Sequence, residues 1–325
     1  MEAAARGEGG MSRTKWGLLP DFLGIGPART GTTWLHEKLL GHIDLPRDIK
    51  ETKFFERNHS RGVEWYASLF KHARGDRPIA EICPYLAGPR APEWIAEVIP
   101  NCKFIVTLRD PVDRMYSHYK MMRGYAFTRL PVEEALQKDR FLAQGSLYAH
   151  NLERWFSVFP RQHFLITLYD DLRRQPQEYL DSITGFIGTP RISLAGQAER
   201  REVINSFDRA PRSFKIAQNA RHLRLNLRER DWNRTATLLA RLGVWSWCAG
   251  GGEKFPSLTA EQDAHFRSMY LPEIEALEQL LALDLSAWKA PRGRSDTAAT
   301  RLASTGTAGS RPAAAASNEL RSKAS

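Results

Sequence analysis

The feature that most constrains the fold is a glycine-bearing turn between a short apolar run and a helical pattern near the N-terminus. The apolar run, 21–26, is typical of a buried strand that breaks at a glycine, and a helix is expected over about 32–40. A strand that turns into a helix presents unpaired backbone N–H groups at the positive end of the helix dipole, where anions bind, phosphates above all. The turn reads Gly26-Pro27-Ala28-Arg29-Thr30-Gly31-Thr32-Thr33.

Apolar runs and amphipathic segments continue to alternate after this turn. Further strands are expected at 78–82, 103–108 and 163–168, and further helices at 61–71, 91–99, 112–124 and 146–159. Alternation of strand and helix is typical of a parallel sheet covered by helices. The pattern therefore predicts an α/β fold with a P-loop-like central parallel β-sheet flanked by helices on both faces.

Two tails and a basic stretch surround this pattern. Residues 1–15 and 290–325 carry no apolar periodicity and are expected to be disordered, because they cannot bury enough apolar surface to offset the entropy of ordering. One domain over 16–289 remains. Within it, the arginine-rich stretch 200–257 is expected to form loops and helices at the surface, and a last helix is expected over 259–283, opened by a capping-box spacing.

The composition limits the kinds of partner. A net charge of +10 indicates anionic partners, which include nucleic acid, an acidic membrane surface and a small phosphorylated ligand. No stretch approaches the roughly 18 apolar residues of a membrane span, and the N-terminus lacks an apolar signal core, so we expect no membrane span and a cytoplasmic protein. Cys83, Cys102 and Cys248 lie far apart in the sequence, which favours free thiols over a disulfide framework or a metal site.

The turn differs from a nucleotide triphosphatase P-loop in where its cation lies. Gly26 and Gly31 have the P-loop spacing, but Thr32 stands where that motif has a lysine, and Arg29 lies inside the loop instead. The run Arg-Thr-Gly-Thr-Thr resembles the signature loop of the sulfotransferases that depend on 3′-phosphoadenosine 5′-phosphosulfate (PAPS). The resemblance implies that PAPS is bound by Arg29, Thr30, Gly31, Thr32 and Thr33, with Arg29 also catalytic.

A second donor-binding element is expected where the run 103–108 meets the next helix. Asp110 is a candidate cap and Pro111 a candidate first helical residue, so Arg109 lies at the carboxyl end of a strand, where open α/β sheets bind ligands. Ser117 follows about two turns into the helix, and a guanidinium with a nearby hydroxyl suits a phosphate dianion. In the family that Arg-Asp-Pro turn and that serine bind the 3′-phosphate of the donor, which implies the same role for Arg109 and Ser117.

Transfer of a sulfuryl group also needs a base for the attacking hydroxyl or amine. The segment 49–55 resembles the Lys-Glu-x-x-Phe-Phe element of the heparan-sulfate type of sulfotransferase, the N- and 3-O- branch, in which the glutamate is the base; this implies that Glu51 is the catalytic base. The run 62–70 continues the resemblance. An unperturbed imidazole titrates near neutral pH, so four histidines stay open as alternative bases, namely His36, His42, His59 and His118.

The chain departs from the family pattern at three places. Arg29 stands where the heparan-sulfate branch usually has lysine, and Ile82 replaces a cation in the family's Glu-Lys-x-Pro-x-Tyr strand end. The family's late donor-binding loop is matched only loosely by 251–256, with Glu253 at a usually basic place. Lys254 is the candidate donor ligand in this loop, and the arginines of 200–234 are the alternative.

The sequence thus predicts a sulfotransferase that moves a sulfuryl group from PAPS to a hydroxyl or amine of a saccharide, glycosylated or small-molecule acceptor, by in-line displacement that releases PAP and needs no metal. A P-loop kinase or NTPase is the first alternative, and the missing lysine after Gly31 argues against it. A basic nucleic-acid-binding protein is the second, with tryptophans of 232–247 as stacking groups. Much of the basic excess lies in the tails and one loop region, so no nucleic acid partner is expected.

Overall fold

The computed structural model describes residues 13, 14, 16–195 and 207–290. The two expected tails, 1–15 and 290–325, lie almost wholly outside the described residues. Within the described ranges, none of the helices is both long and apolar enough to cross a lipid bilayer.

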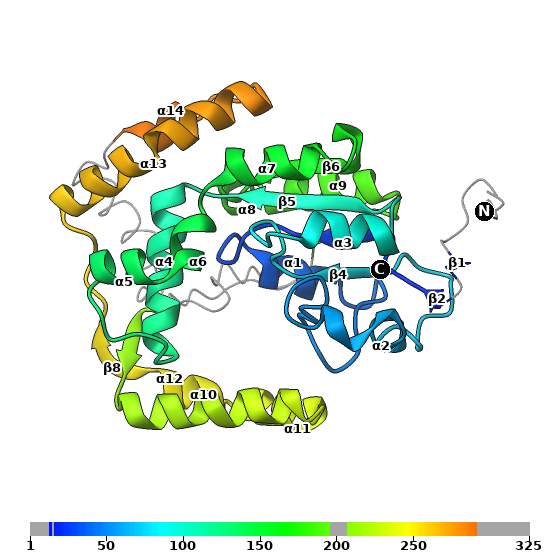
Figure 1. Ribbon diagram of the computed structural model, residues 1–325, viewed down its shortest axis with the longest axis horizontal. Coiled ribbons are helices and arrows are strands. Elements are labelled where there is room, and N and C mark those ends of the chain that lie inside the picture. The colour runs from blue at the N-terminus through cyan, green and yellow to red at the C-terminus, as the bar shows by residue number, and fades with distance from the viewer. Residues whose placement is uncertain (1–12, 15, 196–206, 291–325) are drawn as a thin grey trace, which may run out of the picture.

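Four parallel strands form the centre of the molecule, in the order β4-β3-β5-β6 (Figure 1). Leu23 of β3 lies opposite Glu81 on one side and Phe104 on the other. The strand order reverses at β3, because the chain adds β4 on one side of it and then β5 on the other. The strands are β3 (Phe22–Gly24), β4 (Ala80–Ile82), β5 (Lys103–Leu108) and β6 (Phe164–Leu168), each where the sequence predicts one.

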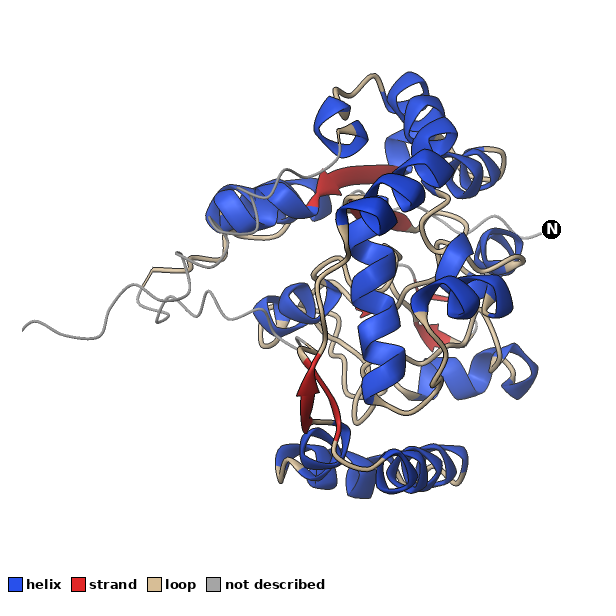
Figure 2. Ribbon diagram, turned by 90° about the vertical axis from the view of Figure 1, so that its left-hand side faces the viewer, coloured by secondary structure: helices blue, strands red, loops and turns tan. Residues whose placement is uncertain are grey.

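Two apolar clusters cover the two faces of this sheet. Successive strand side chains point to opposite faces, so Leu23 and Phe104 join one cluster and Phe22 and Ile105 join the other. The first cluster includes residues of α3 (Ala91–Val98), α4 (Pro111–Gly124), α7 (Tyr148–Phe156) and α13 (Ala260–Leu281), and the second includes residues of α1 (Thr32–Leu39) and α9 (Pro176–Ile187). The predicted α/β fold with helices on both faces is confirmed (Figure 2).

The helix boundaries follow their capping residues. Asp110 accepts hydrogen bonds from the backbone N–H groups of Val112 and Asp113 at the start of α4, and Thr259 forms the expected capping box at the start of α13. The single helix expected over 61–71 is instead a 3-10 turn, η1 (His59–Arg61), followed by α2 (Val63–Ser68). Gly62 separates them because its φ of 83° is outside the helical region.

Shorter elements complete the body of the molecule. They are β1 (Arg13–Thr14), β2 (Gly17–Leu18), α5 (Val132–Lys138), α6 (Arg140–Gln144), η2 (Arg161–His163), α8 (Tyr169–Arg174) and α14 (Ser286–Lys289).

The basic stretch forms a separate layer along one side of the molecule (Figure 1). It contains α10 (Phe214–Glu229), α11 (Asn233–Arg241) and α12 (Val244–Ala249), which pack around a small apolar cluster of Leu227, Ala236 and Trp245. The surface helices expected here are confirmed for the described residues. An antiparallel pair, β7 (Arg209–Pro211) and β8 (Gly251–Lys254), was not predicted, because strands this short that contain proline and glycine show no alternation.

Candidate active site

The loop between β3 and α1 lies at the carboxyl end of β3, next to the end of β5. Its two glycines are required by close packing: a Cβ on Gly26 would lie 2.9 Å from the backbone nitrogen of Thr107, and a Cβ on Gly31 would collide with Leu172. Gly31 also has a φ of 89°, which favours glycine. The hydroxyl of the buried Thr30 donates to the carbonyl of Pro27 at 2.8 Å and closes the turn. The loop is therefore a tightly packed turn before the N-terminus of α1, a position that suits an anion.

Arg29 joins the loop to both parts of the second predicted element. Its Nε donates to Ser117 Oγ at 3.0 Å, and its carbonyl oxygen accepts a hydrogen bond from Nη1 of Arg109 at 3.1 Å. Arg29 has a φ of 80°, a conformation that costs a residue with a Cβ about 1 to 3 kcal/mol and is concentrated at functional sites. The structure thus brings together Arg29, Ser117 and Arg109, as the sequence predicts.

Positive charge accumulates at this edge of the sheet. Burial, together with the nearby charge of Arg109, lowers the pKa of Arg29 to about 10. Lys120 follows Ser117 by three residues on α4; burial lowers its pKa, Asp208 opposes that shift, and the charges of Arg109 and Arg29 add to it. Cations that repel one another in this way favour a bound anion. Lys120 was not predicted, although its helical spacing from Ser117 was a usable signal.

The candidate base lies beside the loop. Lys50 Nζ is 3.0 Å from the hydroxyl of Thr33 and 3.4 Å from Oε1 of Glu51, and Lys53 Nζ is 4.0 Å from Oε2 of the same carboxylate. Burial by itself would raise the pKa of Glu51, but the charges of Lys53 and Lys50 outweigh it and lower the pKa below its usual value of 4.5. Glu51 is therefore an ionised carboxylate, one third exposed at 32%. Lys50, predicted only as its neighbour, links it to the loop.

A buried carboxylate positions this segment from behind. Glu81 of β4 accepts hydrogen bonds from the backbone N–H of Thr52 at 2.7 Å, from the hydroxyl of Tyr66 at 2.9 Å and from that of Tyr85 at 3.2 Å. Its side chain is fully buried, and burial raises its pKa. Since Thr52 follows Glu51 directly, this network fixes where the candidate base lies. The sequence carried no signal for this role.

The four histidines occupy different environments. Burial lowers the pKa of His36 to about 4 and that of His118 to about 3. His118 Nδ1 accepts a hydrogen bond from Nη1 of the buried Arg114 at 3.1 Å, so this nitrogen is already engaged. His59 stacks on a tryptophan ring at 4.0 Å, and His42 is exposed. Their roles as alternative bases stay predictions.

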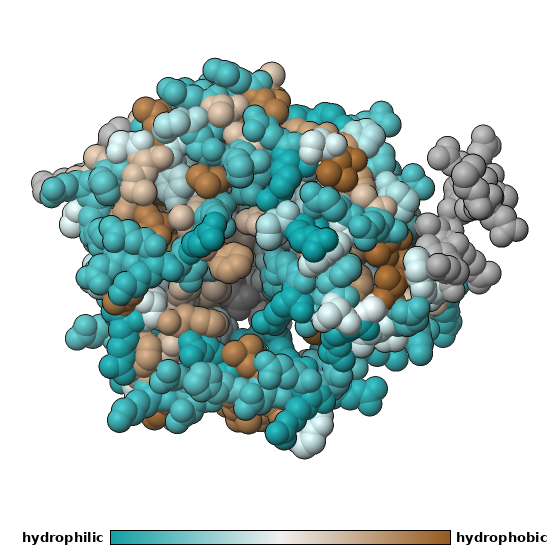
Figure 3. Space-filling model, viewed as in Figure 1, coloured by the Kyte–Doolittle hydropathy of each residue, from teal (hydrophilic) through white to brown (hydrophobic). Residues whose placement is uncertain are grey.

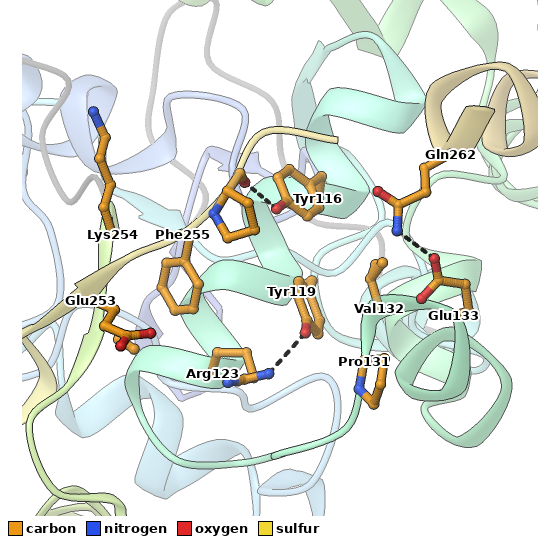
Figure 4. A pocket seen from close by; sticks show the side chains of 12 residues that line it. Tyr116, Tyr119, Arg123, Pro131, Val132, Glu133, Glu253, Lys254, Phe255 and Gln262 are labelled. Carbon is orange, nitrogen blue, oxygen red and sulfur yellow. Dashed lines mark hydrogen bonds between the residues drawn. The ribbon is translucent and has the colours of Figure 1, made fainter. Parts of the chain in front are cut away.

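Lys254 lies at the exposed end of β8, beside a pocket of about 260 Å³. The pocket is lined by residues of α4, the start of α5, β7, β8, the segment after β8 and the start of α13. Figure 4 shows the Lys254 ammonium extending away from the aromatic side chains of the pocket. Arg29 contacts both Ser117 and Arg109, whereas Lys254 remains a predicted donor ligand on the strength of sequence alone.

Comparison with known proteins identifies the family. The model of the sulfotransferase domain matches residues 19–275. The chain belongs to the sulfotransferase family. It is 35% identical over 196 residues to the human bifunctional heparan sulfate N-deacetylase/N-sulfotransferase 3, and 32% identical over 203 residues to the mouse bifunctional heparan sulfate N-deacetylase/N-sulfotransferase 4. These matches cover 52% and 54% of this chain but only 22% and 23% of the relatives, so the chain spans about a fifth of their length.

A solved sulfotransferase shares the fold. The crystal structure of the sulfotransferase from Alicyclobacillus acidocaldarius superposes with a TM-score of 0.59 at 21% sequence identity, covering 84% of this chain and 99% of that one. The predicted P-loop-like architecture of this sulfotransferase domain is thereby confirmed.

Proposed function

We propose that this sulfotransferase-family chain transfers a sulfuryl group from PAPS to a hydroxyl or amine. The observation that carries the proposal is the contact set of Arg29, whose side chain donates to Ser117 and whose carbonyl accepts from Arg109. These contacts join the signature loop and the predicted 3′-phosphate element into one cationic edge. A kinase or NTPase would need a lysine at the end of the loop, where this chain has Thr32.

Different residues of the protein bind the two ends of PAPS, the 3′-phosphate and the phosphosulfate. Arg109, with Ser117 and the nearby positive charge of Lys120, binds the 3′-phosphate as a charge-assisted, forked contact. The loop residues Thr30 to Thr33 and the N-terminus of α1 hold the phosphosulfate, because their backbone N–H groups and the helix dipole favour an anion. Lys50 lies at this end too, through its contact with Thr33.

The chemistry is an in-line displacement at sulfur. Glu51 takes the proton of the acceptor hydroxyl or amine, the acceptor oxygen or nitrogen forms a bond to sulfur, and the bond between sulfur and the bridging phosphate oxygen breaks. PAP leaves with the bonding electron pair as negative charge on that oxygen. Arg29 and Lys50 stabilise this charge, which grows in the transition state. Proton abstraction by a positioned carboxylate contributes roughly 10²- to 10⁴-fold in rate.

A saccharide is the proposed acceptor. The relatives that match half of this chain are heparan sulfate N-deacetylase/N-sulfotransferases, and the Lys50-Glu51 element resembles that branch. This proposal is supported by the sequence similarity of the matched region. The proposed acceptor atom is an oxygen or a nitrogen.

Thermal unfolding with two nucleotides tests the donor. PAP should raise the melting temperature, since a ligand at about 100 times its Kd stabilises the native state by about 2.7 kcal/mol. ATP with magnesium should leave it unchanged, because the loop lacks the P-loop lysine. Equal stabilisation by both nucleotides, or stabilisation by ATP alone, would contradict the proposal.

A further inference from the structure

The helical layer of α10, α11 and α12 exposes many large apolar side chains. Among the described residues eleven such side chains are exposed, and six of them lie within 214–249. Single exposed apolar residues are normal on a protein surface, but a concentration of them on one layer marks an interaction surface. The six are Ile216, Leu223, Trp232, Leu238, Leu242 and Trp247.

These side chains point away from the small apolar cluster inside the layer. Residues two apart in a helix lie on nearly opposite sides of it. Trp247 therefore lies across α12 from the buried Trp245, and Leu238 lies across α11 from the buried Ala236. Figure 3 shows apolar side chains among hydrophilic ones along the lower edge of the molecule, where Figure 1 places this layer. The layer thus has an apolar core of its own and a second apolar set that faces solvent.

Ion pairs at the turn between α10 and α11 attach the layer to the body of the molecule. Arg61 donates two hydrogen bonds to Asp231, at 2.6 and 3.0 Å. Arg234 Nε lies 3.3 Å from Oδ2 of Asp48. Because Asp231 is paired with a cation of the body, its negative charge does little to offset the positive charge of the layer itself.

The layer carries a large part of the positive charge of the chain. Residues 214–249 contain seven Lys and Arg against two Asp and Glu, a net charge of +5 out of the +10 of the whole chain. Lys215 and Arg230 are exposed, and they neighbour the exposed Ile216 and Trp232 in the sequence. A second copy of this face would carry the same charge and be repelled, whereas an anionic surface would be attracted.

We propose that the solvent-facing side of this layer docks on an anionic lipid bilayer. Basic groups that surround exposed leucine and tryptophan side chains are typical of elements that lie in the membrane interface. The cations attract anionic headgroups, and the apolar side chains enter the boundary between headgroups and acyl chains. Tryptophan suits that boundary because its ring is apolar and its N–H is polar. The inference goes beyond the proposed chemistry, since it concerns the surface on which the protein works.

Sedimentation of the full chain with lipid vesicles tests the proposal. One set of vesicles is phosphatidylcholine alone, and the other contains about 30% phosphatidylserine. Binding to the second set should be at least roughly tenfold tighter and should weaken as salt is added. Brominated phosphatidylcholine in the second set should quench tryptophan fluorescence, because Trp232 and Trp247 enter the interface. Equal binding to both sets, or no binding to either, would overturn the proposal.

An apolar substitution tests whether the exposed side chains enter the bilayer. Trp247→Ala should weaken binding to the phosphatidylserine vesicles roughly tenfold, because an inserted aromatic side chain is lost. Phe141→Ala is the matched control, since Phe141 of α6 and Trp247 are both 65% exposed. Equal losses in the two variants, or no loss in Trp247→Ala, would refute insertion of this face.

A charge substitution tests the attraction of the layer to anionic lipid. The double variant Lys215→Gln with Arg230→Gln should weaken binding roughly 30-fold, because two cations near the membrane surface are lost. Arg173→Gln with Arg174→Gln removes two exposed cations from α8 and should leave binding unchanged. If the α8 variant loses as much affinity as the α10 variant, overall charge and not this layer drives binding.

Two further measurements distinguish a bilayer from other partners. Polyglutamate that binds as tightly as the anionic vesicles, with no loss in Trp247→Ala, would identify an acidic polypeptide and overturn the proposal. Size-exclusion chromatography without vesicles should show no dimer that Trp247→Ala dissociates, since such a dimer would mean that a second copy covers the face. Neither vesicle binding nor these measurements require PAP or turnover, so failure of the proposed sulfuryl transfer would be seen separately.

Discussion

Arg109 donates from Nη1 to the carbonyl oxygen of Arg29 at 3.1 Å, so a side chain at the end of β5 holds the backbone of the loop that follows β3. This contact spans the point at which the strand order reverses, where doubly wound sheets bind their ligands. It also supports Arg29 in a backbone conformation that is unfavourable for a residue with a Cβ.

Arg109→Ala should weaken PAP binding by about 30-fold or more, because it removes both a phosphate ligand and a support of the loop. Titration calorimetry with PAP measures this. Arg173→Ala, which removes an exposed cation from α8, is the matched control and should bind PAP as the wild type does. Unchanged affinity in Arg109→Ala would remove Arg109 from the donor site.

Glu51→Gln should lower turnover roughly 10²- to 10⁴-fold while PAP affinity stays the same, since the amide cannot accept the acceptor proton. Glu56→Gln is the control, because Glu56 is also a carboxylate partner of Lys53, at 3.4 Å. Turnover is followed by PAP release. Full turnover in Glu51→Gln would move the role of base to His36 or another histidine.

The pH dependence should report the pKa of Glu51. A base must be ionised to act, and Lys53 and Lys50 hold this pKa below 4.5, so the acid limb of kcat/KM should lie below pH 4.5. Lys50→Met removes a charge and a hydrogen bond that both lower the pKa of Glu51, so this pKa should be higher in the variant than in the wild type. The acid limb should move to higher pH, with folding checked by circular dichroism at each pH. An unmoved limb would show that another group titrates.

Gly31→Ala should destabilise the protein by about 1 to 3 kcal/mol more than Gly41→Ala. Both glycines have a left-handed φ, 89° and 83°, but a Cβ on Gly41 meets nothing within 4 Å whereas one on Gly31 collides with Leu172. Urea unfolding measures the free energy of unfolding of both variants. Because both share the cost of a left-handed φ, the difference between them reports the collision with Leu172. Equal stability of the two would show that the loop has room at Gly31.

Glu81→Gln should change how stability depends on pH. Burial raises the pKa of Glu81, so the native state binds this proton more tightly than the unfolded chain does. The resulting stability is fully present below about pH 4.5 and is lost as pH rises through the raised pKa. The free energy of unfolding of the wild type, minus that of the variant, should therefore fall as the pH rises from about 4.5 through the raised pKa of Glu81. A difference that is constant with pH would mean that Glu81 titrates normally.

The sequence was sufficient to predict the strands of the sheet and the position of Arg109 next to the loop. The run 103–108 and the Asp110-Pro111 start of α4 fixed the strand and helix boundaries, and the carboxyl-end rule then placed Arg109 next to the loop. The role of Glu81 was beyond this reasoning. It depends on how the segment 48–61 folds over β4, and no local periodicity of the sequence indicates that contact.

The loop at Gly26 is held more firmly on Thr107 than the helices α10 and α11 are held on the segment 48–61. The loop packs on the backbone at the end of β5, whereas the two ion pairs that join α10 and α11 to the segment 48–61 are exposed, with Arg234 84% and Asp231 52% exposed, and are worth about 1 kcal/mol or less each. These ion pairs thus hold α10 and α11 to the segment 48–61 more weakly than packing holds the loop to β5. Substitutions at these two exposed pairs should therefore leave the packing of Gly26 on Thr107 unchanged.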